Sequence, residues 1–364
     1  MSVFIFIIVL LALVVFHELG HFFAAKAVKM KVLEFGVGFP PKIFGKKFSP
    51  DGTEYSVNWI PFGGFVRIFG EDPKDMSEPG AFTQKTPLAQ AFVLFAGPFA
   101  NIVLAVLLSA VAFMVGATAV IDSSNEGQNA RDVRVVVGQV LPDSPASRAG
   151  IQPGDEIESL TVGGTTYLIS KPEQVSEIVS GTGEPITFSL IQNGEKKSIE
   201  VQAVSGLIEE DPARPAIGVA TALIGVVSYS PLRAFAEALV TTGDNVVFIV
   251  VSLGTLIGSA LTLTADVSQV AGPVGIASLA GEAAAFGLGS LLSFAALLSI
   301  NLGIINLLPF PALDGGRLLF LGIESVTRKK IPVRVAGVLN TAGFGILILL
   351  MVAVTVGDVA RLLG

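Results

Sequence analysis

Long apolar stretches alternate with polar, glycine- and proline-rich segments along this 364-residue chain. A helix needs about 20 mostly apolar residues to cross a bilayer. A charged block at roughly residues 122–214 is punctuated by glycine and proline, which predicts a water-soluble domain inserted between apolar helices. The stretches that predict membrane spans are Ser2–Ala25, Leu88–Ile121, Val246–Ala265, Ala283–Leu313 and Val335–Gly357.

The composition supports a membrane protein and excludes several other classes. Hydrophobic residues make up 51% of the chain, charged residues 15%, and the mean hydropathy is +0.72, beyond the range of soluble globular proteins. The net charge of −7 gives no basic surface for nucleic acid. The chain has no cysteine, which excludes disulfides, thiolate zinc ligands and a cysteine nucleophile. It also lacks a G-x-S-x-G pattern, which argues against a serine hydrolase.

The basic residues predict how the chain crosses the membrane. Lysine and arginine gather at residues 26–47, after the first span, and at 328–334, before the last span. Such enrichment in short loops marks the cytoplasmic side, so the inserted domain should lie outside the cytoplasm. The chain must then cross the membrane an odd number of times between the inserted domain and residues 328–334. Two apolar stretches, Val246–Ala265 and Ala283–Leu313, lie between them, so one of these does not cross. We expect Val246–Ala265 to be an interfacial helix, because Gly254 and Gly258 interrupt it; the alternative is a genuine span.

Both histidines of the chain, His17 and His21, lie four residues apart in the first span, with Glu18 beside the first. Four residues advance a helix by about 400°, so the two imidazoles face the same way one turn apart. This H-E-x-x-H spacing allows two nitrogens to hold one zinc ion while the carboxylate reaches its water. The alternative is a pair of helix-packing histidines, one bonded to the glutamate. Since a charge inside an apolar segment is costly, we favour the metal. We expect this segment, which lacks a signal-peptide cleavage pattern, to remain in the mature protein.

A third protein ligand is expected, because two histidines do not complete a catalytic zinc site. Asp314 is the favoured candidate: it ends the long apolar stretch, within the string N-x-x-P-x-P-x-L-D-G-G, in which two prolines break the helix and two glycines permit a tight turn. The predicted topology brings it to the depth of the histidines. Glu282 and Glu324 are weaker candidates, since neither has such a broken-helix setting.

Residues 31–86 have a β-strand pattern instead of a helical one. Ile43–Phe48 and Glu54–Ile60 flank a Ser-Pro-Asp-Gly-Thr turn sequence, which predicts a hairpin. This hairpin enters the membrane only if protein or water covers its backbone, and a plain cytoplasmic loop is the alternative. Further turn or bulge positions are Gly36, Gly38, Gly63 and Gly64.

The inserted block, residues 130–206, begins with a strand-like run at Val133–Val140. The string that follows at residues 144–157, S-P-A-x-x-A-G-I-x-P-G-D-x-I, resembles bacterial PDZ domains. A PDZ domain binds an extended peptide along a sheet edge; the alternative is a steric spacer that binds nothing. Its remaining elements are expected to be a Gly163-Gly164 turn, a helix at Pro172–Val179, and strands at Ile186–Gln192 and Lys197–Ala203.

Taken in order, these motifs resemble the site-2 protease family of intramembrane zinc metalloproteases, in its PDZ-containing branch typified by the regulator-of-sigma-E protease. The likeness covers nearly the whole chain and includes Phe95–Asn101, Gly272–Ile276 and Ser299–Ile305. The resemblance implies that Zn²⁺ is bound by His17, His21 and Asp314, with Glu18 as the catalytic carboxylate.

The resemblance also implies a substrate-binding surface. Asn306 would help hold the substrate backbone, and the glycine-rich β segment with Gly36, Gly38, Gly63 and Gly64 would line the unwound substrate strand. Asn101 matches a position packed near the active site, for which an interhelical hydrogen bond without a catalytic part is the alternative.

The predicted fold is an α-helical integral membrane protein with about four transmembrane helices, a membrane-associated β-hairpin and an inserted α+β PDZ domain. We expect it in the bacterial inner membrane, with the PDZ domain outside and the active site near the cytoplasmic face. Its expected partners are the lipid bilayer, single-span membrane protein substrates such as anti-sigma factors or remnant signal peptides, and a peptide ligand of the PDZ domain. The alternative function is a non-proteolytic zinc-binding scaffold. The expected segments are 1–30, 31–86, 87–122, 130–206, 230–280, 283–327 and 333–364.

Overall fold

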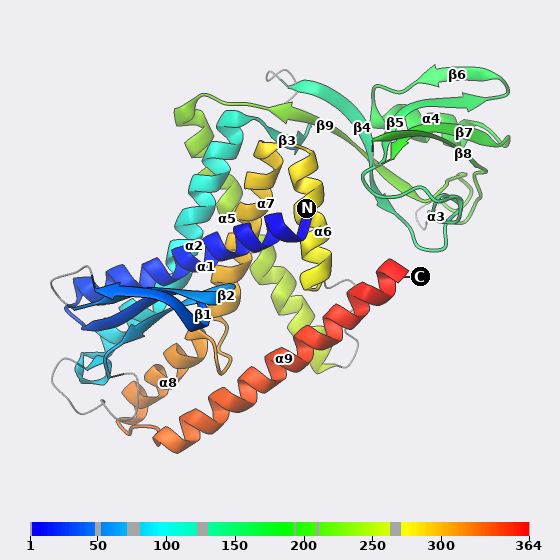
Figure 1. Ribbon diagram of the computed structural model, residues 1–364. Coiled ribbons are helices and arrows are strands. Elements are labelled where there is room, and N and C mark those ends of the chain that lie inside the picture. Colours follow the sequence, from blue (N-terminus) through cyan, green and yellow to red (C-terminus); the bar gives the residue numbers. More distant parts are fainter. Residues whose placement is uncertain are drawn as a thin grey trace. The chain divides into compact units, whose positions relative to one another are not determined.

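The computed structural model describes residues 2–47, 52–70, 81–121, 130–192, 194–208, 211–262 and 271–363. The chain forms two compact units (Figure 1). The helical unit comprises Met1–Val115 and Ser230–Gly364, and the sheet unit comprises Gly116–Tyr229.

The helical unit contains long apolar helices, as the sequence predicts. Within the described ranges, five are long and apolar enough to cross a membrane, which fits an integral membrane protein but exceeds the expected four. These five are α1 (Ser2–Ala27), α2 (Pro87–Val115), α5 (Pro231–Leu261), α7 (Leu288–Leu307) and α9 (Val333–Leu363). The shorter helices of this unit are η1 (Phe82–Gln84), α6 (Pro273–Ala285) and α8 (Asp314–Thr327).

The additional candidate span is α5, which was expected to be interfacial. That expectation rested on the direction of α7, which must run parallel to α1. The structure shows this direction: Gly281, shortly before α7, packs against Ser2, and Asp314, shortly after it, contacts His17. Helix α6 lies between α5 and α7 in the chain and packs on α1. The direction of α7 is therefore as predicted, and α5 is nonetheless long and apolar enough to cross a membrane.

Two predicted spans are shorter than their apolar stretches. The predicted 87–122 helix ends at Val115, because Gly116 has a φ of 112° that favours glycine. The predicted 283–327 helix is three elements: α6 ends at Ala285, α7 ends at Leu307 and α8 begins at Asp314. Apolarity continues across these breaks, so hydropathy alone does not reveal them.

Helix α2 packs between α1 and α7 through small residues. A Cβ on Gly20 of α1 would collide with the carbonyl of Ala96, and one on Gly303 of α7 would lie 2.9 Å from the carbonyl of Pro98. Small residues permit this close approach of helix backbones in a membrane. Helix α2 is thereby held against both helices that lead to the candidate site.

The predicted hairpin is present, formed by β1 (Val32–Lys47) and β2 (Glu54–Ile68) in antiparallel pairing. Both strands are longer than predicted. The buried carboxylate of Glu34 accepts a 2.7 Å hydrogen bond from Ser56 Oγ. The same carboxylate pairs with Lys42 Nζ at 3.1 Å and Arg67 Nη2 at 3.3 Å. Glu34 therefore ties together both strands of the hairpin.

The sheet unit is an antiparallel sheet with two short helices, α3 (Pro145–Ala149) and α4 (Pro172–Gly181). Its described strands follow the order β3-β9-β4-β5-β7-β8, and β6 pairs with β5. The strands are β3 (Ala117–Val120), β4 (Arg131–Val140), β5 (Glu156–Val162), β6 (Thr165–Leu168), β7 (Ile186–Gln192), β8 (Glu195–Val201) and β9 (Val219–Val227).

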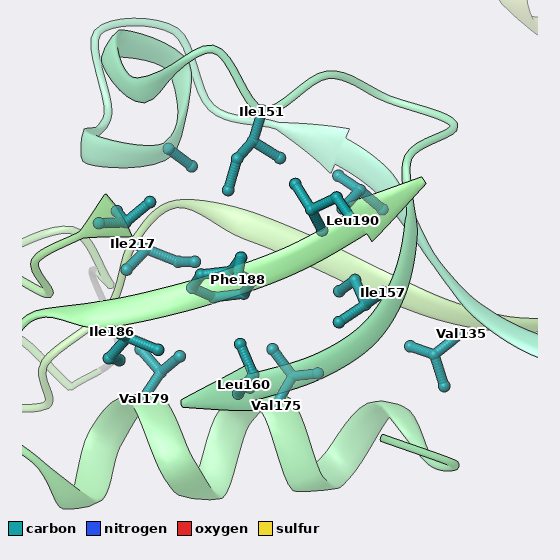
Figure 2. Packing of buried hydrophobic residues seen from close by; sticks show 13 residues of the cluster. Val135, Ile151, Ile157, Leu160, Val175, Val179, Ile186, Phe188, Leu190 and Ile217 are labelled. Carbon is teal, nitrogen blue, oxygen red and sulfur yellow. The ribbon is translucent and has the colours of Figure 1, made fainter. Parts of the chain in front are cut away.

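The core of the sheet unit lies between the sheet and α4, where Phe188 packs near Leu160 and Val175 (Figure 2). The unit is longer than the predicted 130–206 segment. Strand β9 pairs with both β3 and β4, so residues 117–120 and 219–227 are part of the sheet. Their pairing is long-range and leaves no local signal in the sequence. The PDZ assignment of this unit stays a prediction.

Glu34→Gln should loosen the hairpin, because the amide loses both ion pairs while remaining buried. We expect a loss of roughly 2 kcal/mol in local stability, measured as faster amide hydrogen exchange at Gly36 and Val37. Glu54→Gln is the matched control, since Glu54 shares Lys42 at 2.7 Å but is more exposed. Equal exchange in the two variants would contradict a special role for Glu34.

Candidate metal centre

Two histidines of α1 and one carboxylate of α8 converge inside the helical unit. His17 Nε2 and His21 Nε2 each lie 3.1 Å from Asp314 Oδ2, and 3.1 Å from each other. Both histidines are buried. Within the described ranges, these three residues form the only group of histidines and carboxylates close enough to share a metal ion.

The outer nitrogens of the two imidazoles also have partners. His21 Nδ1 donates to the carbonyl of Val93 at 2.8 Å, which leaves the lone pair of its neutral form on Nε2. His17 Nδ1 lies 3.1 Å from the side-chain amide of Asn101, whose buried Oδ1 has no hydrogen-bond partner among the described residues. Amide oxygen and nitrogen are assigned from such networks. Turning the amide lets Oδ1 accept from His17 Nδ1–H and places the His17 lone pair on Nε2 as well.

The centre then holds three electron-donating atoms that face one another. Two imidazole lone pairs and a carboxylate oxygen at 3.1 Å repel each other unless a cation lies among them. Two histidines and one carboxylate suit a zinc site with an open position. The residues therefore fit zinc.

The space around this centre depends on Gly97 of α2. A Cβ at this position would collide with His21 Nε2 and lie 2.8 Å from His17 Nε2. The glycine therefore lets α2 pass the metal-binding atoms while Asn101, one turn later, reaches His17. Ser299 Oγ of α7 donates to the carbonyl of Asn101 at 2.8 Å, which ties all three helices together at this depth.

Asp314 reaches the histidines because the chain breaks between α7 and α8. Pro309 and Pro311 lie in this break, and Ala312 has a φ of 77°. A Cβ on Gly315 would collide with the carbonyls of Leu307 and Leu308, so the first turn of α8 packs directly on the end of α7. The two glycines that follow Asp314 therefore allow two backbone segments to approach each other closely.

A cavity of about 430 Å³ opens beside the centre. It is lined by Glu18, Asn306, Gly63, Gly64 and the three metal-binding candidates, so these predicted site residues come together. Gly64 lies close to Glu18, because a Cβ on the glycine would be 3.3 Å from Glu18 Cγ. The cavity therefore adjoins both the carboxylate of α1 and strand β2.

Other predicted residues lie farther from the cavity. Gly36 and Gly38 belong to β1, where Gly36 pairs with Phe65 and leaves room for its ring. Glu282 lies on α6, 3.4 Å from Ser278 Oγ, and Glu324 accepts a hydrogen bond from the Ile331 backbone. Neither glutamate belongs to the metal-binding group.

Sequence reasoning missed three contributors to the centre. Gly97 was identified only as part of the Phe95–Asn101 string, and the carbonyl of Val93 gives no side-chain signal. Arg317, which lines the cavity, follows Asp314 by three residues. That spacing places it on the same side of α8 and could have identified it.

Comparison with known proteins agrees with this geometry. The profile of peptidase family M50 matches residues 5–350. The chain belongs to peptidase family M50. A relative from Clostridium perfringens, whose name describes a candidate zinc metalloprotease, is 34% identical over 96% of this chain and 95% of its own length. Zinc metalloprotease RasP of Geobacillus kaustophilus is 30% identical over 99% of this chain and 98% of its own. RasP of Oceanobacillus iheyensis is 28% identical over 98% of each.

Membership of the M50 family confirms the predicted resemblance to site-2 proteases and the predicted enzyme class, a zinc metalloendopeptidase. With several long apolar helices, the chain fits a multi-pass membrane protein. The roles of individual residues remain predictions, supported by their convergence on one centre.

Gly97→Ala should reduce zinc binding, because the added methyl group occupies the space of the imidazole nitrogens. We expect at least a roughly tenfold loss of zinc affinity, comparable to that seen when outer-shell partners of a metal are disturbed, measured by titration with a competing chelator. Gly243→Ala on α5 is the control, since a Cβ there meets no atom within 4 Å. Unchanged affinity in Gly97→Ala would contradict the proposed position of the metal.

Proposed function

We propose that this M50 zinc peptidase is an intramembrane endopeptidase that hydrolyses peptide bonds in or beside the transmembrane segments of single-span membrane proteins. Regulated proteolysis of anti-sigma factors and removal of remnant signal peptides are the favoured reactions. The observation that carries the proposal is the convergence of His17, His21 and Asp314 beside a cavity that also contains Glu18. Both histidines belong to a helix long and apolar enough to span a bilayer.

His17, His21 and Asp314 are the proposed zinc ligands. When bound, zinc supplies Lewis-acid polarisation of the scissile carbonyl and acidifies a water molecule. Glu18 accepts the proton of the attacking water and later delivers it to the leaving amine. Its place on the cavity wall, one residue after His17, supports this role. Asn101 and the Val93 carbonyl orient the two imidazoles.

The substrate must be extended before it can be cut, because a helical peptide bond is hydrogen-bonded and sterically covered. Strand β2 runs past Glu18 at Gly63 and Gly64, which both line the cavity, so an extended substrate in the cavity would lie along this strand. Asn306, on the cavity wall, provides an amide that can pair with the substrate backbone. Together they replace hydrogen bonds that the substrate loses on unwinding. Lysine and arginine enrichment favours an active site near the cytoplasmic face and a sheet unit outside.

Glu18→Gln should retain zinc and lose cleavage, because an amide does not accept the proton of water. We expect the rate on a single-span substrate to fall roughly a thousandfold or more, measured with purified protein in detergent alongside its zinc content. Glu282→Gln, on α6 and outside the metal-binding group, should cleave normally. A Glu18→Gln variant that cleaves at the wild-type rate would disprove the assigned base. Wild-type protein that holds zinc but never cleaves, with or without chelator, would favour a non-proteolytic zinc-binding scaffold.

The sheet unit is proposed to be a PDZ domain that filters substrates. Strand β3 pairs with one edge of β9 from Ile224 to Val227. Earlier in β9, the Oγ1 atom of Thr221 lies 3.5 Å from the carbonyl of Pro172, at the start of α4. The β9 edge beside α4 therefore suits the addition of an extended peptide. A bulky ectodomain would be excluded until it is trimmed; the alternative remains a spacer that binds no peptide.

Replacement of Gly116–Tyr229 by a flexible linker should remove this filter. We expect wild-type protein to cut a trimmed substrate and spare its bulky form, and the shortened protein to cut both at similar rates in a gel-based cleavage assay. Leu168→Ala, an exposed change on β6, should preserve the discrimination. Unchanged discrimination after removal of the sheet unit would contradict the filter without affecting the assignment of Glu18.

A further inference from the structure

A second cavity of the helical unit, about 750 Å³ in volume, lies beside the catalytic one. It is formed by η1 and the start of α2, by the outer part of α8, and by the first turns of α9. The proposed catalytic mechanism uses none of its outer residues. Leu94 and Arg317 line both cavities, so the two spaces share a wall.

The charges around this second cavity are strongly unequal. Five basic residues line the cavity, but only one acidic residue, Glu324, lines it among the described residues. Glu324 Oε1 accepts a 2.8 Å hydrogen bond from the Ile331 backbone, and its single negative charge is outnumbered by the five positive charges of the lining. The basic residues are Lys85, Arg317, Arg328, Lys329 and Lys330. Such a surplus of positive charge in a concave site favours an anionic ligand.

Two of these basic side chains are positioned by neighbouring groups. Lys85 Nζ donates to the carbonyl of Val28 at 3.0 Å, and Arg317 Cζ lies 5.4 Å from the ring centroid of Phe82. These contacts hold the two charged groups in place on the cavity wall. They distinguish a formed site from a row of mobile surface lysines.

The cavity also has apolar walls and lies where candidate spans begin. Phe320, Leu321 and Val333 line it together with the basic residues. Helices α2 and α9 begin at Pro87 and Val333, which both border the cavity, and both helices are candidate membrane spans. The beginning of a span marks the boundary between the hydrocarbon core and the headgroup layer. A ligand here therefore meets basic side chains at the interface and apolar side chains toward the membrane.

We propose that this cavity binds an anionic phospholipid, with the phosphate among the basic residues and an acyl chain along the apolar wall. Basic pockets between membrane helices bind lipid headgroups of this kind. A free phosphate would gain nothing from the apolar wall, and a zwitterionic lipid would bring a cation next to Lys329 and Lys330. The site adjoins the catalytic cavity through Arg317, one turn after Asp314 on α8. The proposal concerns binding alone and does not depend on the peptidase activity.

The test measures lipid affinity of the full chain in uncharged detergent by native mass spectrometry. Phosphatidylglycerol and phosphatidylcholine with identical acyl chains are the probes, and we expect the former to bind at least about tenfold more tightly. Lys329→Gln combined with Lys330→Gln should weaken phosphatidylglycerol binding by about tenfold. Lys46→Gln with Lys47→Gln removes the same charge on the hairpin and should leave the affinity nearly unchanged.

A charge-neutral variant separates a cavity from diffuse attraction. Ala336→Phe fills the cavity and should weaken phosphatidylglycerol binding by about tenfold while leaving the charge unchanged. Ala353→Phe, at an exposed position of the same helix, is its control. Ala336→Leu replaces the phenylalanine variant if thermal unfolding shows that the latter does not fold.

Several results would overturn the lipid site. Equal affinity for the two lipids, equal losses in the two lysine double variants, or an undiminished affinity in Ala336→Phe would each do so. Displacement of phosphatidylglycerol by millimolar glycerol phosphate would show a soluble-phosphate site instead. Displacement by an acidic peptide would show a peptide site.

Discussion

One constraint governs the organisation of the helical unit. Electron-donating atoms that face one another in an apolar interior repel each other unless a cation lies among them. Two imidazole nitrogens and a carboxylate oxygen meet there, each 3.1 Å from the others. Without a cation, this arrangement costs the desolvation of a carboxylate and the repulsion of three lone pairs. With a divalent cation, the same atoms form a stable site. Zinc binding and the packing of α1, α2 and α8 therefore stabilise each other.

The neighbouring structure provides the space and orientation that this centre needs. Gly97 removes a methyl group from the region of the metal-binding nitrogens, and Gly20 brings α2 close to α1. The break after α7 turns Asp314 toward the histidines. The hairpin lies on the other side of the cavity and brings Gly64 beside Glu18. The three proposed zinc ligands thus border a cavity, as the proposed hydrolysis of an extended peptide requires.

The sequence predicts those parts of the site that depend on local geometry. Helix periodicity alone places His17 and His21 on one face, and two prolines mark the broken helix before Asp314. The turn sequence after Lys47 likewise predicts the hairpin. Other features depend on contacts between distant segments. The pairing of β9 with β3 and β4 and the need for glycine at position 97 follow from tertiary packing. The described part of the chain has five candidate spans where about four were expected, and the sheet unit is longer than the expected 130–206 segment.

X-ray absorption spectroscopy at the zinc edge tests the central claim most directly. For the purified full chain, the account predicts about one zinc ion with two imidazole nitrogens and at least one carboxylate oxygen at about 2.0–2.2 Å. Asp314→Ala should change this spectrum and weaken zinc binding, and Glu324→Ala should change neither. A spectrum without imidazole scattering, or one that is identical in Asp314→Ala, would contradict a zinc site shared by the first helix and the beginning of α8.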